Sequence, residues 1–450
     1  MSSVVGPEEV RRVSDAALDL PGVDGVEVLF MHEWGGLTRF ANSAMHQSTS
    51  REDTGLRIRV VAGNRIGVAA TNDFTREGAR RAAETAREMA LVSAPDPQFP
   101  GLAPKADVPE RAGAYDEATA SATPERRADG VETLVKRVGD EFRAAGAFET
   151  IAMEIAVANT EGQFAWAPST QASISAVVNG GEGGNGYAER FSTRIDEIDA
   201  DEVGARALAK SESSQRPREL KPGAVTAVLE PNAVSTVVGF LAWIGFGGRA
   251  IAEGRSCFSG KEEQTVAAPS ITIRDDALSP LTIGTPFDFE GVPRRPVDLV
   301  ERGVFRQGVY DLRTAKMVGT QSTGHALPAP NPEGPFPLNL FLEPGDASLE
   351  ELIASTEHGV LVTRFHYSNV VHPVESTITG MTRDGLFVIE DGEIAYPVKN
   401  MRFTQSILEA LSNTTGIGRD TELASEFFLS SARVPALRVE GFHFTGASDH

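Results

Sequence analysis

The sequence has one cysteine, Cys257, in 450 residues. A single thiol excludes an internal disulfide and any paired-cysteine metal or redox motif. No run of about 18 apolar residues occurs, so we expect no membrane-spanning helix. The first ten residues lack a basic segment followed by an apolar stretch, so we expect no secretory signal. Together these absences predict a cytoplasmic protein that does not enter a membrane.

Basic residues are also scarce. Lys and Arg number 42 against 63 Asp and Glu, which gives a formal net charge of −21. A surface of this sign repels a phosphate backbone, and no dense Lys/Arg stripe opposes it. We therefore expect no nucleic-acid partner.

The length and composition indicate a globular chain of several domains. Apolar residues make up 41% of the chain and charged residues 23%, as in folded proteins. The length predicts about two or three domains. The polar stretch 211–223 ends in Pro222-Gly223 and is the best boundary. We expect an N-terminal domain over residues 1–218 and a C-terminal domain over residues 219–450.

The N-terminal part alternates strand-like and helix-like patterns. Apolar alternation bounded by Gly and Asn predicts strands at 26–32, 37–40, 56–61, 65–70, 150–158, 163–167, 173–178 and 187–195. Apolar residues at helical spacing predict helices at 79–90, 124–142 and 201–211. This order is typical of a mixed α/β domain with an antiparallel sheet and flanking helices.

The C-terminal part is dominated by strand patterns, with one exceptional helix at about 231–250. That helix is apolar nearly all round, which predicts burial on several sides. Asp391-Gly392 and Arg302-Gly303 suit hairpin turns. Six prolines in 325–344 predict an extended segment that contacts a partner. The fold class is therefore α+β, ending in a largely antiparallel, barrel-like β domain with one buried helix.

Three of the eight histidines are candidate metal ligands. His366 and His372 flank a strand-like segment, and His325 lies in the proline-rich segment. The first two would lie roughly 20 Å apart on an extended strand. We favour structural roles for these histidines, and a zinc site built from them is an alternative.

Other catalytic chemistry has no clear signature. There is no GxSxG motif, and Cys257 has no recognisable base beside it, which favours a packing role. Paired carboxylates occur at Asp275-Asp276 and at Asp288 and Glu290. Because neighbouring residues on a strand point to opposite faces, we expect no shared acid–base site there.

Several blocks along residues 25–425 carry a resemblance to a known family. They are Leu37-Thr-Arg-Phe-Ala-Asn-Ser43 with His46-Gln47, Arg57–Gly63 running to Ala70–Asp73, Phe258-Ser-Gly-Lys261, Asp288-Phe-Glu-Gly-Val-Pro293, Gln321-Ser-Thr-Gly324, and Ile389–Ile394 followed by Pro397-Val-Lys399. Their order resembles that of the TldD/PmbA family, also called the modulator-of-gyrase family. An ordered series is far more specific than one motif.

The resemblance implies one of two kinds of subunit. The TldD kind carries HExxxH on the buried helix, with a cysteine near the C-terminus as a further zinc ligand, and the TldE (PmbA) kind lacks these groups. In this sequence the three motif positions fall at Gly239, Phe240 and Ile244. None of these side chains can bind zinc or act as a general base. The segment matching the second ligand region, 416–431, contains no cysteine.

The chain therefore resembles the catalytically silent subunit of a heterodimeric zinc peptidase. The resemblance implies no catalytic residue and no cofactor in this chain, zinc in a TldD-like HExxxH-bearing partner, and unfolded peptides as substrates. The chain would complete a closed chamber and align a substrate strand by backbone pairing. Thr379 and Arg383, in the strand-like segment 377–384, are candidate peptide contacts.

Two alternatives stay open at this point. One is a self-sufficient metallopeptidase with a rearranged site of His325, His366 and His372. The other is a non-enzymatic, peptide-binding homodimer.

Overall fold

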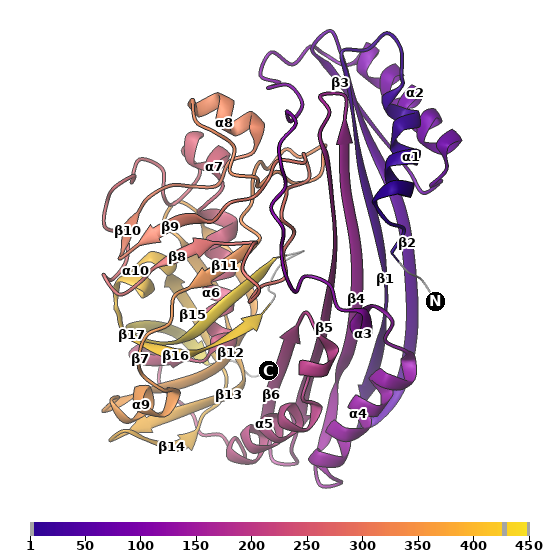
Figure 1. The fold of residues 1–450 in the computed structure, drawn as a ribbon. Coiled ribbons are helices and arrows are strands. Elements are labelled where there is room, and N and C mark those ends of the chain that lie inside the picture. Colours follow the sequence, from indigo (N-terminus) through magenta and orange to yellow (C-terminus); the bar gives the residue numbers. More distant parts are fainter. Residues whose placement is uncertain (1–3, 425–429, 448–450) are drawn as a thin grey trace.

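The computed structural model describes residues 4–424 and 430–447 and contains two β-sheets that lie side by side (Figure 1). The first sheet has six strands, all antiparallel, in the order β3-β2-β1-β4-β5-β6. The second has eleven strands with both parallel and antiparallel pairs. This arrangement confirms the predicted α+β class. Within the described ranges, no helix is both long and apolar enough to cross a membrane.

The N-terminal sheet is built from unusually long strands. They are β1 (Gly25–Ala41), β2 (Ala44–Ala62), β3 (Arg65–Thr71), β4 (Arg143–Asn159), β5 (Phe164–Asn179) and β6 (Asn185–Ser192). The sequence predicts two strands at 26–32 and 37–40, whereas the structure joins them into β1. Gly35 and Gly36 stay paired with β2, and a Cβ at Gly36 would lie 2.2 Å from the guanidinium of Arg127. These glycines allow close packing and do not form a turn.

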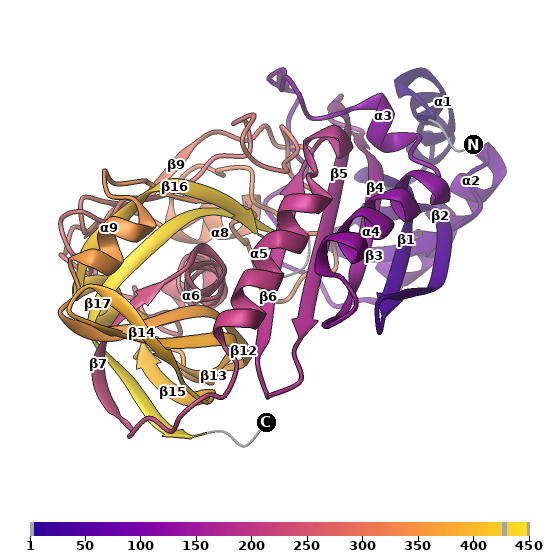
Figure 2. The same cartoon turned by 90° about the horizontal axis from the view of Figure 1, so that it is seen from below.

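Helices cover one face of this sheet (Figures 1 and 2). Helices α1 (Pro7–Leu18) and α2 (Arg76–Val92) pack over one end, and α4 (Pro124–Val138) and α5 (Ala200–Ser213) over the other. Short helices α3 (Glu117–Ala120) and η1 (Ile195–Glu197) lie between them in sequence. Helix α4 begins at Pro124 as predicted, but it ends at Val138 and not at Phe142, because Gly139 has a positive φ of 72°.

Five strands of the C-terminal sheet form a closed ring, which explains its barrel-like character. They are β7 (Gly223–Leu229), β12 (His358–His372), β13 (Thr377–Glu390), β15 (Met401–Ser406) and β17 (Ser431–Ala447). The ring closes because β7 pairs with both β12 and β17. Helix α6 (Pro231–Ile244) lies inside it (Figure 2).

Shorter elements complete this half. The strands are β8 (Ile273–Asp275), β9 (Val297–Glu301), β10 (Val304–Phe305), β11 (Asn339–Leu342), β14 (Glu393–Pro397) and β16 (Thr414–Ala424). The helices are α7 (Gly248–Ala252), α8 (Leu312–Val318), α9 (Leu349–Ala354) and α10 (Ile407–Ser412). The two predicted hairpin turns are confirmed, since Asp391-Gly392 joins β13 to β14 and Arg302-Gly303 joins β9 to β10, all with positive φ.

Helix α6 is shorter than the predicted span of 231–250. The chain leaves the helix after Ile244 and turns, so that Phe246 and Gly248 hydrogen-bond to the backbone of Val309. A Cβ at Gly248 would lie 2.5 Å from the ring of Tyr310. The apolar pattern continues past Ile244, but Gly248 lets the backbone approach Tyr310 more closely than a residue with a Cβ could.

The proline-rich segment 325–344 contacts the chain's own N-terminal sheet. Arg57 of β2 donates a hydrogen bond to the carbonyl of Ala329 at 2.7 Å. Strand β11 occupies part of the segment. Contact with a partner stays a prediction.

Candidate functional site

The three positions assigned to a zinc motif lie in the interior of the closed ring. Phe240 is 2% exposed and Ile244 is 7% exposed. Gly239 is buried, as are most of the 14 residues of α6. Phe240 and Ile244 belong to the main apolar core of the C-terminal half. These positions are therefore core positions in this chain.

The chemistry of the α6 side chains does not fit a zinc ion. Zinc in proteins is bound by thiolate, imidazole or carboxylate groups, and α6 carries none of these. The hydroxyls of Ser235 and Thr236 donate to the carbonyl of Asn232 within the helix. The helix thus supplies packing surface and no ligand set.

The second ligand region of the family resemblance, residues 416–431, covers most of β16 and reaches the first residue of β17. These two strands pair in antiparallel register. Residues 425–429 of this segment lie outside the described residues.

The three candidate histidines do not form a metal site. Among the described residues, no group of three His, Cys, Asp or Glu side chains could hold a metal ion. His325 is fully buried, with Nε2 2.9 Å from Asp275 and Nδ1 2.9 Å from the hydroxyl of Thr323. His366 is half-buried and His372 is exposed, both on β12. This arrangement supports a structural role for His325.

Cys257 is buried in the same core as α6. Burial raises the pKa of its thiol to about 12. The thiol is therefore protonated at neutral pH and unreactive, which supports the packing role expected from the sequence.

Thr379 and Arg383 lie on β13, with side chains directed away from the barrel core that their neighbour Ile378 enters. The hydroxyl of Thr379 donates to the carbonyl of Phe403 at 2.7 Å. The Nε of Arg383 lies 3.9 Å from the carboxylate of Asp384. Neither residue lines the cavity that Arg294 and Asn339 help to form. Their contact with a peptide stays a prediction.

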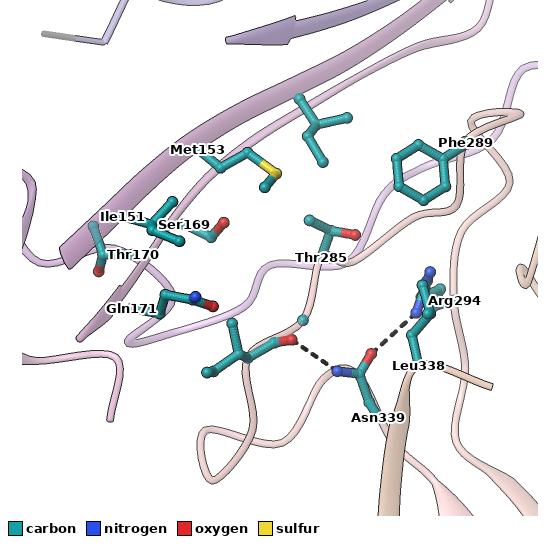
Figure 3. Close-up of a pocket in the computed structure, with 13 residues that line it drawn as sticks. Ile151, Met153, Ser169, Thr170, Gln171, Thr285, Phe289, Arg294, Leu338 and Asn339 are labelled. Carbon is teal, nitrogen blue, oxygen red and sulfur yellow. Dashed lines mark hydrogen bonds between the residues drawn. The ribbon is translucent and has the colours of Figure 1, made fainter. Parts of the chain in front are cut away.

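A cavity of about 70 Å³ lies where the N-terminal sheet meets the C-terminal half (Figure 3). Strands β4 and β5 form one wall, and the loop before β9 together with the start of β11 forms the other. The lining includes Ile151, Met153 and Gln171 on the sheet and Phe289, Arg294 and Asn339 opposite them. Apolar walls with a few fixed polar groups are typical of small-ligand sites.

Hydrogen bonds fix the orientation of Asn339 in this cavity. Its backbone N–H donates to Asp275 at 2.7 Å, and its Nδ2 donates to the carbonyl of Ile283 at 2.8 Å. Its Oδ1 is thereby left to accept from Nη1 of Arg294 at 3.0 Å (Figure 3). A side chain held in this way can position the guanidinium beside it.

A buried charged cluster also joins the two halves. Arg59 of β2 donates to Glu27 of β1 at 2.7 Å and to Glu290 of the C-terminal half at 3.0 Å. Each of the three residues is at most 8% exposed. Burial raises the pKa of Glu27 to about 7, although Arg59 opposes this. Burial, together with the charge of Glu290, raises the pKa of Asp288 to about 7.

Glu27 and Asp288 make stability depend on pH. Each carboxyl has a folded pKa above its unfolded value, so the folded state binds more protons between those values. Stability is then highest at the acidic end of the window and falls as the pH rises through about 7, by about 1–3 kcal/mol per group. Denaturant unfolding at pH 5, 6 and 7 measures this slope.

The matched variant for this prediction is Glu27→Gln, which removes one titrating group and keeps the side-chain shape. We expect the free energy of unfolding of this variant to change less steeply with pH, because Glu27 no longer contributes to the slope. A slope identical to that of the unmodified chain would contradict the assignment to Glu27.

Asp288 and Glu290 lie at a turn, so the strand geometry that was expected to separate paired carboxylates does not apply to them. The amide of Glu290 donates to Asp288 at 3.0 Å. Both are buried and their charges interact. A usable sequence signal is present at Glu27 and Arg59, because each is a charged residue with an apolar residue on either side in its strand. The position of Arg294 had no such signal.

Three family models match the chain in succession. Residues 26–90 match the PmbA/TldA metallopeptidase domain 1, residues 104–215 the central domain and residues 222–446 the C-terminal domain. Together they cover both sheets.

Individual relatives and a solved structure agree with these matches. The chain is 24% identical over 435 residues to Metalloprotease PmbA of Escherichia coli O157:H7, covering 93% of this chain and 92% of that protein. It is 33% identical over 181 residues to a Metalloprotease of Methanothermobacter thermautotrophicus, a match that spans 39% of each protein. The crystal structure of TldE from Thermococcus kodakarensis has a TM-score of 0.88 at 21% identity, covering 98% of this chain and 99% of that one. The fold is shared.

Proposed function

The chain belongs to the PmbA/TldD family, whose domains are described as metallopeptidase domains, and we propose that it is the subunit of such a peptidase that does not bind zinc. It pairs with a TldD-like subunit that carries HExxxH and the zinc ion. The pair degrades or processes unfolded peptides in the cytoplasm.

The packed interior of α6 is the observation that carries this proposal. Phe240 and Ile244 fill the centre of the closed ring where a zinc-binding relative needs a base and a ligand. Each large apolar side chain buried there contributes about 1.5–3 kcal/mol. A helix stabilised in this way favours a structural role in the peptidase over hydrolysis.

The outer part of β2 supports a role in aligning an extended chain. Strand β3 pairs with β2 only from Leu56 onward, and residues 44–53 are exposed. Among the described residues, no strand pairs with the outer edge of this segment. An unpaired edge offers backbone donors and acceptors to a peptide or to a strand of the partner subunit.

Reconstitution tests the proposal. The purified chain is assayed with an unfolded peptide substrate alone, then mixed with the TldD-like subunit of the same source, with that subunit alone as the control. We expect hydrolysis only when the HExxxH-bearing subunit is present, and a faster rate in the mixture. Hydrolysis by the chain alone contradicts the proposal, and an unchanged rate on mixing favours the peptide-binding homodimer.

A further inference from the structure

We propose that the cavity between the two sheets binds a carboxylate attached to an apolar group, as at the C-terminal residue of a peptide. The proposal extends the function proposed above, because it names the end of the peptide that this subunit would hold. It rests on Arg294, on the groups around that side chain and on the opposite wall of the cavity.

Arg294 is a buried cation without a direct ion pair. The residue is 3% exposed, and no carboxylate oxygen in the described part of the chain lies within 4.0 Å of its guanidinium. Its Nη1 donates to Asn339, and its Nε has no hydrogen-bond partner among the described protein atoms. Burial lowers the pKa of Arg294, while the charges of Asp275 and Asp288 oppose that shift. Buried charges are normally paired.

The two nearby carboxylates are already used by other donors. Asp275 accepts from His325 and from the backbone of Asn339. Asp288 accepts from three backbone amides, those of Glu290, Val292 and Ala326. The charges of Asp275 and Asp288 stabilise the charged form of Arg294. Their oxygens, however, accept no hydrogen bond from its guanidinium in the described structure. A ligand carboxylate would supply acceptors that the protein does not.

The cavity wall opposite Arg294 combines apolar and polar side chains. Ile151 and Met153 of β4 face Phe289 across the cavity (Figure 3). Strand β5 adds the polar side chains of Ser169, Thr170 and Gln171, and the hydroxyl of Thr170 already donates to the carbonyl of Thr193. A volume of about 70 Å³ is several times the ~10–15 Å³ that one water needs by the same measure. It has room for a small aliphatic side chain next to a carboxylate.

This combination discriminates an acid from an amide. A guanidinium donates to a carboxylate through charge-assisted, bidentate hydrogen bonds. A C-terminal amide has no charge and only one acceptor. Asn339 holds the guanidinium in place, so little ordering is needed on binding.

Calorimetric titration of the intact chain tests the inference with three probes: acetyl-Ala-Ala-Leu, its C-terminal amide, and free leucine. We expect one binding site for the free-acid tripeptide and affinity weaker by about tenfold or more for the amide. Equal affinity for acid and amide would overturn the proposal. Free leucine binding as tightly as the tripeptide would identify a small free carboxylate as the ligand, whereas binding of the tripeptide alone would identify a peptide end.

Two substitutions and one control locate the site. Arg294→Met removes the cation at similar volume, and Gln171→Glu leaves Arg294 intact but places a competing carboxylate in the cavity. We expect both to weaken tripeptide binding by about tenfold or more. Arg295→Met is the matched control, because this neighbouring arginine is exposed. We expect the Arg295→Met chain to bind the tripeptide with unchanged affinity. Unchanged binding in both cavity variants would refute the site.

These titrations need neither the partner nor hydrolysis. Failure of the carboxylate site would therefore leave the proposed zinc-free role standing. Failure of that role in reconstitution would likewise leave the titrations interpretable.

Discussion

Phe240→Glu destabilises the C-terminal half by about 3–5 kcal/mol, the cost expected for losing a buried aromatic ring and for burying an unpaired charge. The side chain of Phe240 is 2% exposed and packs inside the closed ring of strands. A carboxylate there has no cation on α6 to pair with. Denaturant unfolding followed by circular dichroism measures the loss, and the free energy of unfolding is the quantity compared.

Trp243→Glu is the matched control for this prediction. It introduces the same charge on the same helix, three residues away, where the aromatic side chain is 54% exposed. A solvated carboxylate costs little, so we expect a change within about 1 kcal/mol. If Phe240→Glu were tolerated as well as the control, the ring would not be packed around position 240, and a polar site on α6 would become plausible.

Arg59→Met also carries a large effect, because it removes the only cation that bonds Glu27 and Glu290 in the described structure. Two buried carboxyls are then left facing each other. Breaking a buried ion pair by removing one partner costs about 3–5 kcal/mol. We expect this loss in the free energy of unfolding at pH 7. The loss should shrink at pH 5, because Glu27 already has a raised pKa and is protonated there.

The control for this prediction is Arg39→Met, on the neighbouring strand β1, where the arginine is exposed. A surface change of this kind costs within about 0.5 kcal/mol. Equal stability of Arg59→Met and Arg39→Met at pH 7 would show that the cluster does not join the two halves. A loss that grows at pH 5 would contradict the assigned protonation.

Local sequence signals predicted the elements better than their lengths. Helix α2 and the hairpin at Asp391-Gly392 follow from helical spacing and turn chemistry, which act over a few residues. The end of α6 at Ile244 depends instead on Tyr310, which packs against Gly248 just beyond the helix. The continuity of β1 likewise depends on the backbone of Thr150, which packs against Gly35. Helix α1 was not predicted at all, although Val10, Val13 and Ala17 form its buried face.

The candidate site was less predictable because its parts are distant in sequence. Arg59 and Glu290 are 231 positions apart, and Arg294 meets Asn339 across 45. Nothing in the local pattern around Arg294 marks it as buried, since the exposed Arg295 follows directly. By contrast, the apolar character of positions 239, 240 and 244 is visible in sequence once the helix is placed. The absence of zinc ligands on this helix could therefore be proposed from the sequence alone, whereas the carboxylate site could be proposed only from the structure.

The zinc content of the purified chain is the most direct test of the proposal that this subunit binds no zinc. The chain is incubated with zinc, dialysed, and measured by elemental analysis, first alone and then in complex with its TldD-like partner. We predict no retained zinc in the chain alone and about one zinc ion per complex, held by the partner. Stoichiometric zinc retained by the chain alone would contradict the claim that α6 is a hydrocarbon-packed helix in a subunit without a metal site.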